Sequence, residues 1–371
     1  MSNNKYGKNA PSDMSTRMIE QFIEMVKIDS ESGNEKNMIE YLEKEFQLLG
    51  ADTYIDDYGN LLCRLDALNS SNDTPILLSC HADTVKPGKN IQPVIKDGVI
   101  SSEGNTILGA DDKAGIAEML EALRIAKMRP IVEIAITKEE EVGLLGVNEL
   151  DFNWLNAKKG FLLDNDTLET IVIGGPSYYT LDVVIKGRAA HAGMEPEKGI
   201  NAVLAASKAI SKLPLGRLDE ETTSNVGVIK GGMIRNGVPA ETSFLAECRS
   251  LDHNKAEKLA NQMKEIIVEQ VNSVGATVSI QINNPFKAVE IPPDSETVKV
   301  SMQALKKAGI DAKTTFITGF TDASVYNNKG IETAVVGIGA KLEHSTEEHI
   351  HISDMEKALI MIVEILRISA E

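Results

Sequence analysis

The sequence predicts an α/β protein with an open mixed sheet, into which a second, ferredoxin-like domain of βαββαβ order is inserted. Short apolar runs at 76–80, 131–136 and 161–163 are typical of strands that are covered on both faces. A helical pattern after Asp112 separates the first two runs, so β and α elements alternate, as in a sheet with helices on both sides. The chain has 371 residues, which exceeds the usual size of a single hydrophobic core. We therefore expect two domains.

The predicted main domain begins with two helices and a hairpin. Apolar residues recur with helical spacing from Ser15 to Val26 and again after Asn34, and Gly50 is suited to end the second helix. Two short strand patterns at 52–55 and 61–65 surround a turn that contains Gly59. The polar residues 1–13 are predicted to form a disordered tail.

The pattern changes after Tyr178, where strands and helices follow one another in the order βαββαβ. The expected elements are strands at 180–186, 223–229, 242–248 and 276–282 and helices at 201–213 and 254–272. The α/β pattern resumes near Ile291, with helices at 295–308 and 353–369 and strands at 314–317 and 333–338. The predicted domains are thus a main domain at 1–177 and 289–371 and an inserted lid or dimerisation domain at 178–288.

Charge and composition exclude several classes of partner. A formal net charge of −17 argues against binding to nucleic acid, because that affinity depends on a cationic surface. No apolar run has the length of a membrane span, and the polar start does not resemble a signal peptide. Of three widely spaced cysteines, Cys63, Cys80 and Cys248, two lie in apolar strand-like runs and are expected to be buried thiols, and no disulfide framework is expected. These features predict a cytoplasmic protein that binds neither membranes nor nucleic acid.

Acidic residues and histidines follow the ends of the predicted core strands. These residues are His81 and Asp83, Glu139-Glu140-Glu141, Asp164 and, after a loop, His344. In an open α/β sheet, ligands bind beyond the carboxyl ends of the strands, so these side chains should converge. So many carboxylates in one crevice would repel one another unless cations held them.

Each of these short motifs also has an ordinary explanation when it is taken alone. His81-Ala82-Asp83 suits a metal ligand whose imidazole is oriented by Asp83, because residues two apart share a face of a strand, but a lone histidine is more often structural. Asp111-Asp112 could cap the helix that follows, and Glu139-Glu140-Glu141 could be a solvated charge run. The complete set, in this order, is far more specific than its members.

That set resembles the motifs of the peptidase T-like (tripeptide aminopeptidase) zinc metallopeptidases, within the aminoacylase and carboxypeptidase G superfamily. The matching segments are His81-Ala82-Asp83-Thr84, Gly109 to Gly115, Glu140 to Gly143, Leu163-Asp164 and His344. The resemblance extends from about Met14 to Ile368, and its most specific segment is Leu108 to Ala117.

The resemblance implies a centre of two Zn²⁺ ions per subunit, for which Co²⁺ or Mn²⁺ could substitute. Asp111 would bridge the two metals, with His81 and Asp164 on one side and Glu141 and His344 on the other. Glu140 would act as the general base, and Asp83 would orient a ligand. A cis peptide bond is expected between Asp111 and Asp112.

The resemblance also assigns residues of the inserted domain. His191, in the loop from Gly187 to Gly193, would hydrogen-bond the developing oxyanion, and Asn236 and Arg249 would bind substrate. Arg249 suits a peptide carboxylate because its guanidinium is planar and always charged. A surface salt bridge is the alternative explanation for Arg249. By analogy with dimeric relatives, we expect a homodimer through the inserted domain, with His191 acting in its own chain or across to the neighbouring subunit.

One segment departs from the family pattern, because the expected Gly-Gly-Thr-Asp turn is Gly319-Phe320-Thr321-Asp322 here. The ring of Phe320 could narrow the pocket, which leaves the tripeptide preference open. We predict hydrolysis of amide bonds in short peptides, with di- and tripeptide aminopeptidase activity first. An N-acyl amino acid hydrolase or carboxypeptidase with the same centre, and a catalytically silent metal-binding protein, remain as alternatives.

Overall fold

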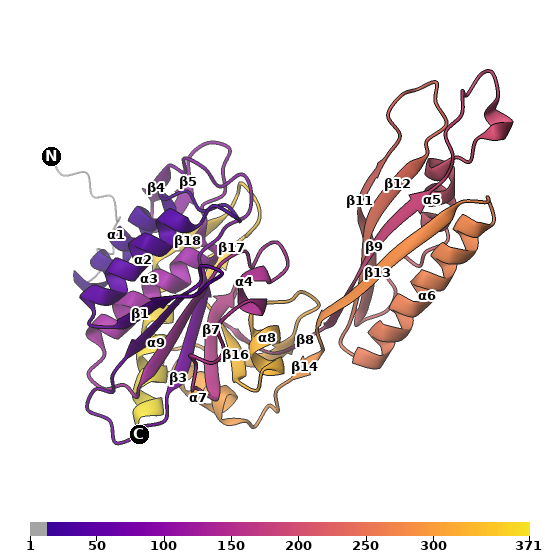
Figure 1. The fold of residues 1–371 in the computed structure, drawn as a ribbon. Coiled ribbons are helices and arrows are strands. Elements are labelled where there is room, and N and C mark those ends of the chain that lie inside the picture. Colours follow the sequence, from indigo (N-terminus) through magenta and orange to yellow (C-terminus); the bar gives the residue numbers. More distant parts are fainter. Residues whose placement is uncertain (1–12) are drawn as a thin grey trace. The chain divides into compact units, whose positions relative to one another are not determined.

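The computed structural model describes residues 13–371, which fold as two compact units (Figure 1). The main unit comprises the described residues up to Ile173 together with Glu290–Phe316 and Thr321–Glu371. The inserted unit comprises Gly174–Val289 and Ile317–Phe320. The tail predicted at 1–13 lies outside the described residues, except for Asp13, at which helix α1 begins. None of the helices within 13–371 combines the length and the apolar character that crossing a bilayer requires.

Within the described residues, the main unit is built on a mixed sheet of nine strands. Eight of them follow the order β1-β2-β6-β3-β7-β16-β8-β14, and β15 pairs with β8. Their bounds are β1 Asp52–Ile55, β2 Leu61–Leu65, β3 Ile76–His81, β6 Val132–Thr137, β7 Lys159–Asn165, β8 Thr170–Gly175, β14 Val289–Glu290, β15 Lys313–Phe316 and β16 Glu332–Gly337. Strands β6, β3, β7 and β16 run parallel to one another. The mixed sheet of the α/β prediction is therefore confirmed.

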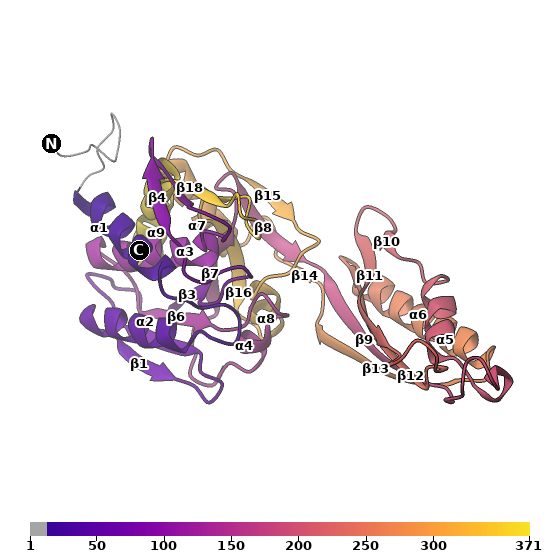
Figure 2. The ribbon, with the colours of Figure 1, turned by 90° about the horizontal axis from the view of Figure 1, so that it is seen from above.

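Helices cover both faces of this sheet (Figure 2). Along one face α1 packs on α3, α3 on α9, and α9 on α7, whereas α2, α4 and α8 lie along the other. Their bounds are α1 Asp13–Val26, α2 Lys36–Leu48, α3 Ala110–Ile125, α4 Leu145–Asn148, α7 Glu296–Lys307, α8 Ala323–Asn328 and α9 Ile352–Ala370.

Helix α3 differs from the amphipathic helix expected after Asp112. It is buried on nearly every side, and its buried residues include Lys113, Glu118 and Glu121. Because α1 and α9 flank it in the helical layer, even its polar positions are withdrawn from water.

A small separate sheet, ordered β17-β18-β5-β4, has no counterpart in the prediction. Its strands are β4 Pro93–Lys96, β5 Val99–Ser102, β17 Ala340–Lys341 and β18 His349–His351. The turn between β4 and β5 is Asp97-Gly98, in which both residues have positive φ values of 52° and 81°. An Asp-Gly pair of this kind is a strong hairpin signal.

The inserted unit has the predicted ferredoxin-like arrangement. Its sheet has the order β10-β11-β12-β9-β13, and helices α5 and α6 pack on one face of it (Figure 1). The bounds are β9 Ser177–Lys186, the 3₁₀ helix η1 Pro196–Lys198, α5 Ala202–Ile210, β10 Gly216–Arg217, β11 Thr222–Gly231, β12 Glu241–Ser250, α6 His253–Asn272 and β13 Thr277–Phe286. Buried and exposed residues alternate along β9, because only the helix side of the sheet is covered.

Candidate metal centre

The parallel strands of the main unit bring the predicted ligands to one edge of the sheet. His81 is the last residue of β3, Asp164 lies near the end of β7, and Glu141 follows the end of β6. Asp111 lies in the first turn of α3, and His344 lies in the loop between β17 and β18. The convergence expected from the topology is therefore present.

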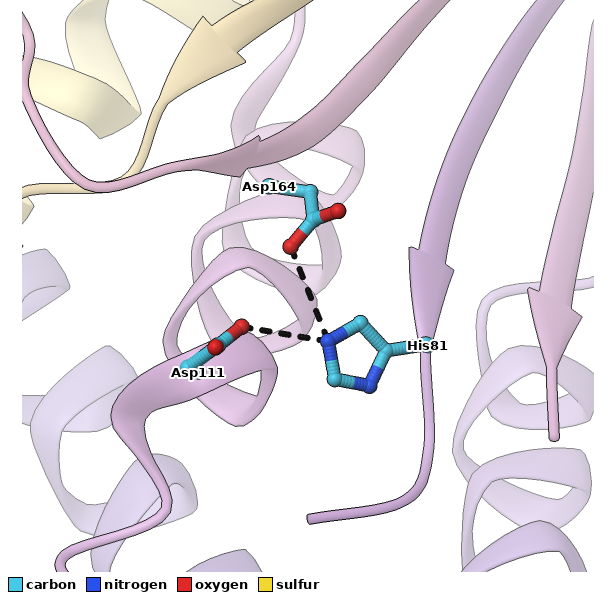
Figure 3. A group of neighbouring side chains, drawn as sticks. All are labelled: His81, Asp111 and Asp164. Atoms are coloured by element: carbon cyan, nitrogen blue, oxygen red, sulfur yellow. Dashed lines mark hydrogen bonds and ion pairs between the residues drawn. The ribbon is translucent and has the colours of Figure 1, made fainter. Parts of the chain in front are cut away.

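His81, Asp111 and Asp164 form the first ligand group (Figure 3). His81 Nε2 lies 3.1 Å from Asp111 Oδ1 and 3.6 Å from Asp164 Oδ1. His81 and Asp164 are almost fully withdrawn from solvent, with side-chain exposures of 2% and 8%.

Asp111, Glu141 and His344 form the second group. His344 Nε2 lies 2.9 Å from Glu141 Oε1 and 3.3 Å from Asp111 Oδ2. Asp111 thus offers Oδ1 to the first group and Oδ2 to the second. The cis peptide bond predicted after it, between Asp111 and Asp112, is present.

The spacing of these atoms suits zinc. Ligand atoms about 2.0–2.1 Å from a tetrahedral zinc ion are about 3.3 Å from one another. The measured separations of 2.9–3.6 Å fall around that value. Imidazole nitrogen and carboxylate oxygen are also donors that zinc accepts. Two ions that share Asp111 therefore fit the residues present.

The two histidines compensate the negative charge of the neighbouring carboxylates. Although burial would raise the pKa of Asp111, hydrogen bonds from His344 and His81 hold it below its ordinary value. Hydrogen bonds to Asp111 and Glu141 in turn raise the pKa of His344 to about 10. Burial raises the pKa of Asp164 to about 7. A metal ion that binds here must displace protons.

The carboxylate of Asp83 mainly hydrogen-bonds the backbone of the segment after β6, and not the imidazole of His81. His81 Nδ1 lies 3.0 Å from the main-chain oxygen of Asp83 and 3.4 Å from its carboxylate. That carboxylate accepts hydrogen bonds from the backbone N–H of Glu140 (3.0 Å), the backbone N–H of Glu141 (3.3 Å) and Ser32 Oγ (2.7 Å). Asp83 thereby fixes the backbone of the predicted base and of the ligand that follows it.

Glu140 is buried beside this centre, with 7% exposure. Burial raises its pKa well above the ordinary value, and the charge of Asp164 acts in the same direction. A carboxyl in this environment can hold a proton, as a residue that transfers protons during catalysis must.

Two buried acids of this region were not assigned a role from the sequence. Asp322 accepts a hydrogen bond from Thr137 Oγ1 at 2.5 Å, and burial raises its pKa to about 7. Glu348 accepts hydrogen bonds from the backbone N–H groups of Gly109 and Asp111. The sequence signal for Asp322 was its place at the end of the turn Gly319-Phe320-Thr321-Asp322, which departs from the family pattern. The signal for Glu348 was its position four residues after His344.

The remaining predicted residues, His191, Asn236 and Arg249, belong to the inserted unit. His191 is exposed, and its Nδ1 accepts hydrogen bonds from the backbone N–H groups of Gly193 (3.2 Å) and Met194 (3.1 Å). Its proton therefore lies on Nε2, which is free to donate. The backbone N–H of Ala192 donates to the main-chain oxygen of Asn236, so the two loops lie side by side.

Arg249 has partners within the inserted unit. Its guanidinium forms an ion pair of 2.9 Å with Glu247 and lies over the rings of Tyr178 (5.1 Å) and Phe320 (4.4 Å). Phe320 also packs against Phe286. The residue that departs from the family pattern is thus a direct neighbour of the predicted carboxylate-binding arginine.

The chain resembles known peptidases over most of its length. Residues 176–274 match the family described as Peptidase dimerisation domain, and residues 60–180 match Peptidase family M28. The uncharacterised protein YqjE of Bacillus subtilis is 37% identical, with 96% of this chain and 99% of that protein covered.

Two solved structures combine similar sequence with the same fold. Aminopeptidase PepT from Bacillus cereus is 36% identical with a TM-score of 0.84, and the match covers 96% of this chain and 99% of that one. A tripeptidase from Staphylococcus aureus is 33% identical with a TM-score of 0.87, and the match covers 96% and 98%. With the two ligand groups that share Asp111, these similarities show that the chain belongs to the peptidase T-like metallopeptidases of the M20 family.

Proposed function

We propose that this protein is a two-zinc exopeptidase that removes the N-terminal residue from di- and tripeptides. The observation that carries the proposal is the position of Asp111, whose two carboxylate oxygens face two separate ligand groups, with Glu140 buried next to Glu141. His81 and Asp164 would complete one site, and Glu141 and His344 the other. Co²⁺ or Mn²⁺ could replace zinc in both.

The residues around this centre have separate roles in amide hydrolysis. Two bound zinc ions would polarise the scissile carbonyl and lower the pKa of the attacking water. Glu140 accepts the proton of that water and returns it to the leaving amine. Asp83 keeps Glu140 in place through its backbone N–H. His191, with its proton on Nε2, is suited to donate to the oxyanion.

The names of the solved relatives favour cleavage at the N-terminus, since they are an aminopeptidase and a tripeptidase. An N-acyl amino acid hydrolase or carboxypeptidase is the second candidate, because Arg249 lies on the inserted unit as a group that could bind a carboxylate. The three buried, free cysteines agree with a reducing compartment, and we place the protein in the cytoplasm.

A matched substrate set separates these candidates. Metal-free protein is loaded with zinc, cobalt or manganese and incubated with one tripeptide in three forms: unmodified, N-acetylated and C-terminally amidated. We expect release of the first residue from the unmodified form, slower release from the amidated form, which lacks the carboxylate predicted to bind Arg249, and no cleavage of the acetylated form. Cleavage of the acetylated peptide or of N-acetyl amino acids would favour the second candidate. Failure to cleave any form with any metal would favour a silent metal-binding protein.

We further propose a homodimer through the inserted unit. Its residues 176–274 match a peptidase dimerisation domain. Strand β10 has two residues and pairs with Thr223 and Ser224 of β11. Among the described strands, the rest of β11, including exposed Val228 and Ile229, therefore forms an outer edge of the sheet. Such an edge can pair with a second copy.

Subunit mixing tests whether His191 acts across this dimer. His191→Ala and Glu140→Gln proteins are mixed under conditions of subunit exchange, which mass spectrometry of differently labelled chains verifies. If His191 acts in the neighbouring subunit, mixed dimers contain one complete site and activity returns. If exchange occurs without activity, His191 acts in its own chain or has no catalytic role.

A further inference from the structure

Glu348 forms an unusual set of contacts with the segment that leads to Asp111. Its Oε2 accepts the backbone N–H groups of Leu108 and Gly109, both at 2.7 Å. Its Oε1 accepts those of Ala110 at 2.7 Å and Asp111 at 3.1 Å. Four consecutive N–H groups thus converge on one carboxylate that is 2% exposed.

The other end of Glu348 is joined to His344 by a short, internally bonded loop. Ser345 Oγ donates to the main-chain oxygen of Leu342 at 2.7 Å, and the backbone N–H of Glu347 donates back to Ser345 Oγ at 3.2 Å. The backbone N–H of Glu348 donates to the main-chain oxygen of Ser345 at 3.2 Å. The position of His344 relative to Glu348 is therefore restricted.

These contacts connect two predicted ligands that come from separate parts of the sequence. Asp111 and His344 are far apart in the sequence, yet His344 Nε2 must remain near Asp111 Oδ2, at 3.3 Å in the structure. His344 is half exposed and lies in an irregular loop, so its own packing restrains it little. Glu348 supplies the connection, because it bonds the backbone of one ligand and belongs to the loop of the other.

We propose that Glu348 is a positioning residue for the second ligand group, which sets the separation of His344 and Asp111 and hence the metal affinity of that group. The inference rests on the proposed metal centre. It differs from a general role in stability, because it singles out one of the two sites. Residues that orient metal ligands typically change metal affinity by about 10–100-fold when they are replaced.

The substitutions follow from the hydrogen bonds. Glu348→Gln keeps the side-chain size but places an amide N–H₂ against two backbone donors, so two of the four bonds are lost. Glu348→Asp keeps the charge but is shorter by one methylene group, so it should have an intermediate effect. The exposed neighbour Glu347→Gln removes the same charge from the same loop and serves as the control.

Equilibrium dialysis of metal-free proteins against buffered zinc measures both sites without any assay of activity. His81→Ala and His344→Ala proteins identify which binding step belongs to which ligand group. We expect Glu348→Gln to weaken the step that His344→Ala removes by about 10–100-fold and to weaken the other step, which shares Asp111, much less. In peptide assays, kcat should fall at limiting zinc and recover with excess zinc, whereas Glu347→Gln should behave as the parent.

Parental affinity at both sites in Glu348→Gln would overturn the inference. Equal weakening of both sites, with a lower unfolding temperature of the metal-free protein, would also overturn it, because Glu348 would then only stabilise the fold. If Glu348→Gln does not fold, the same comparison is made with Glu348→Asp. A parent that binds two zinc ions but cleaves no peptide would contradict the proposed function and leave the dialysis test of Glu348 intact.

Discussion

Glu118 is a buried acid on α3 that lacks a hydrogen-bond partner for either carboxylate oxygen within the described residues. Its exposure is 0%, and burial raises its pKa well above the ordinary value, with the charges of Asp112 and Asp354 acting in the same direction. The folded protein therefore binds the proton of Glu118 more tightly than the unfolded chain does. The stability that this group contributes is complete below the unfolded pKa of about 4.3 and is lost as pH rises toward the folded pKa.

Glu118→Gln removes this titration at nearly constant size. The free energy of unfolding of the parent should decrease relative to the variant by up to about 1.4 kcal/mol per pH unit above pH 5. The difference should therefore move in favour of the variant as pH rises from 5, for as long as Glu118 keeps its proton in the folded protein. Even one pH unit at this slope is a substantial part of the stability of a typical domain.

Urea unfolding at pH 5, 6, 7 and 8 measures this difference. The protein has a single tryptophan, Trp154, which lies in the main unit and stacks on Tyr54, so its fluorescence reports on the unit that contains Glu118. The exposed Glu20→Gln on α1 corrects for the change in net charge. A difference between parent and Glu118→Gln that stays constant from pH 5 to pH 8 would refute the reasoning, since Glu118 would then titrate as it does in the unfolded chain.

Four further outcomes are expected. Glu121 is also buried on α3, but it accepts hydrogen bonds from Arg17 and Arg124, each at 2.8 Å. Glu121→Gln should therefore lower the free energy of unfolding by about 1–3 kcal/mol in the same urea assay. An unchanged unfolding midpoint would contradict this. Prolonged dialysis against a chelator should abolish peptide hydrolysis. If zinc is normally present at about 1,000 times its Kd, its removal should also lower the free energy of unfolding by about 4 kcal/mol. Full activity after verified metal removal would speak against a metalloenzyme. Glu140→Gln should reduce kcat by about 10²-fold or more while the bound zinc, measured by metal analysis, stays at the parental level, and loss of zinc would make Glu140 a ligand instead. Because the pKa of His344 is raised to about 10, a proton must leave His344 when zinc binds, and zinc affinity should increase by up to about tenfold per pH unit between pH 6 and pH 8. Competition titrations with a coloured chelator measure this affinity. An affinity that does not depend on pH would contradict the displacement of the proton.

The edge of the sheet that carries the candidate site could be predicted from the sequence, because each strand and the polar residue that follows it form a local pattern. Runs such as Ile76–Cys80 are apolar without interruption, and each is followed directly by an acid or a histidine. Parallel pairing of β3 with β6 and β7 then places their carboxyl ends together regardless of the loops. The roles of the residues at this edge stay predictions until the proposed experiments are done.

Features that depend on distant partners could not be predicted in this way. The helical spacing of α3 indicated one apolar stripe, but Glu121 is compensated by Arg17, which is 104 positions away. The short strands β17 and β18 carry too few residues for a periodicity, and they become a sheet only by pairing with β5. Asp97-Gly98 was the local signal for the hairpin that provides β5, and it lay between the motifs to which a role in the site was assigned.

The acids around the candidate metal centre accept hydrogen bonds largely from neutral donors, and this explains why the site would suit cations. Asp83 accepts the N–H groups of Glu140 and Glu141, and Asp112 accepts that of His81. Glu348 accepts four N–H groups from residues 108–111, where the chain enters α3. Backbone N–H groups fix the position of a carboxylate without cancelling its full charge. The ligand carboxylates themselves are paired with His81 and His344, whose positive charge depends on a proton. Since a metal ion that binds here would displace those protons, the number of protons released on zinc binding is a direct measure of this exchange.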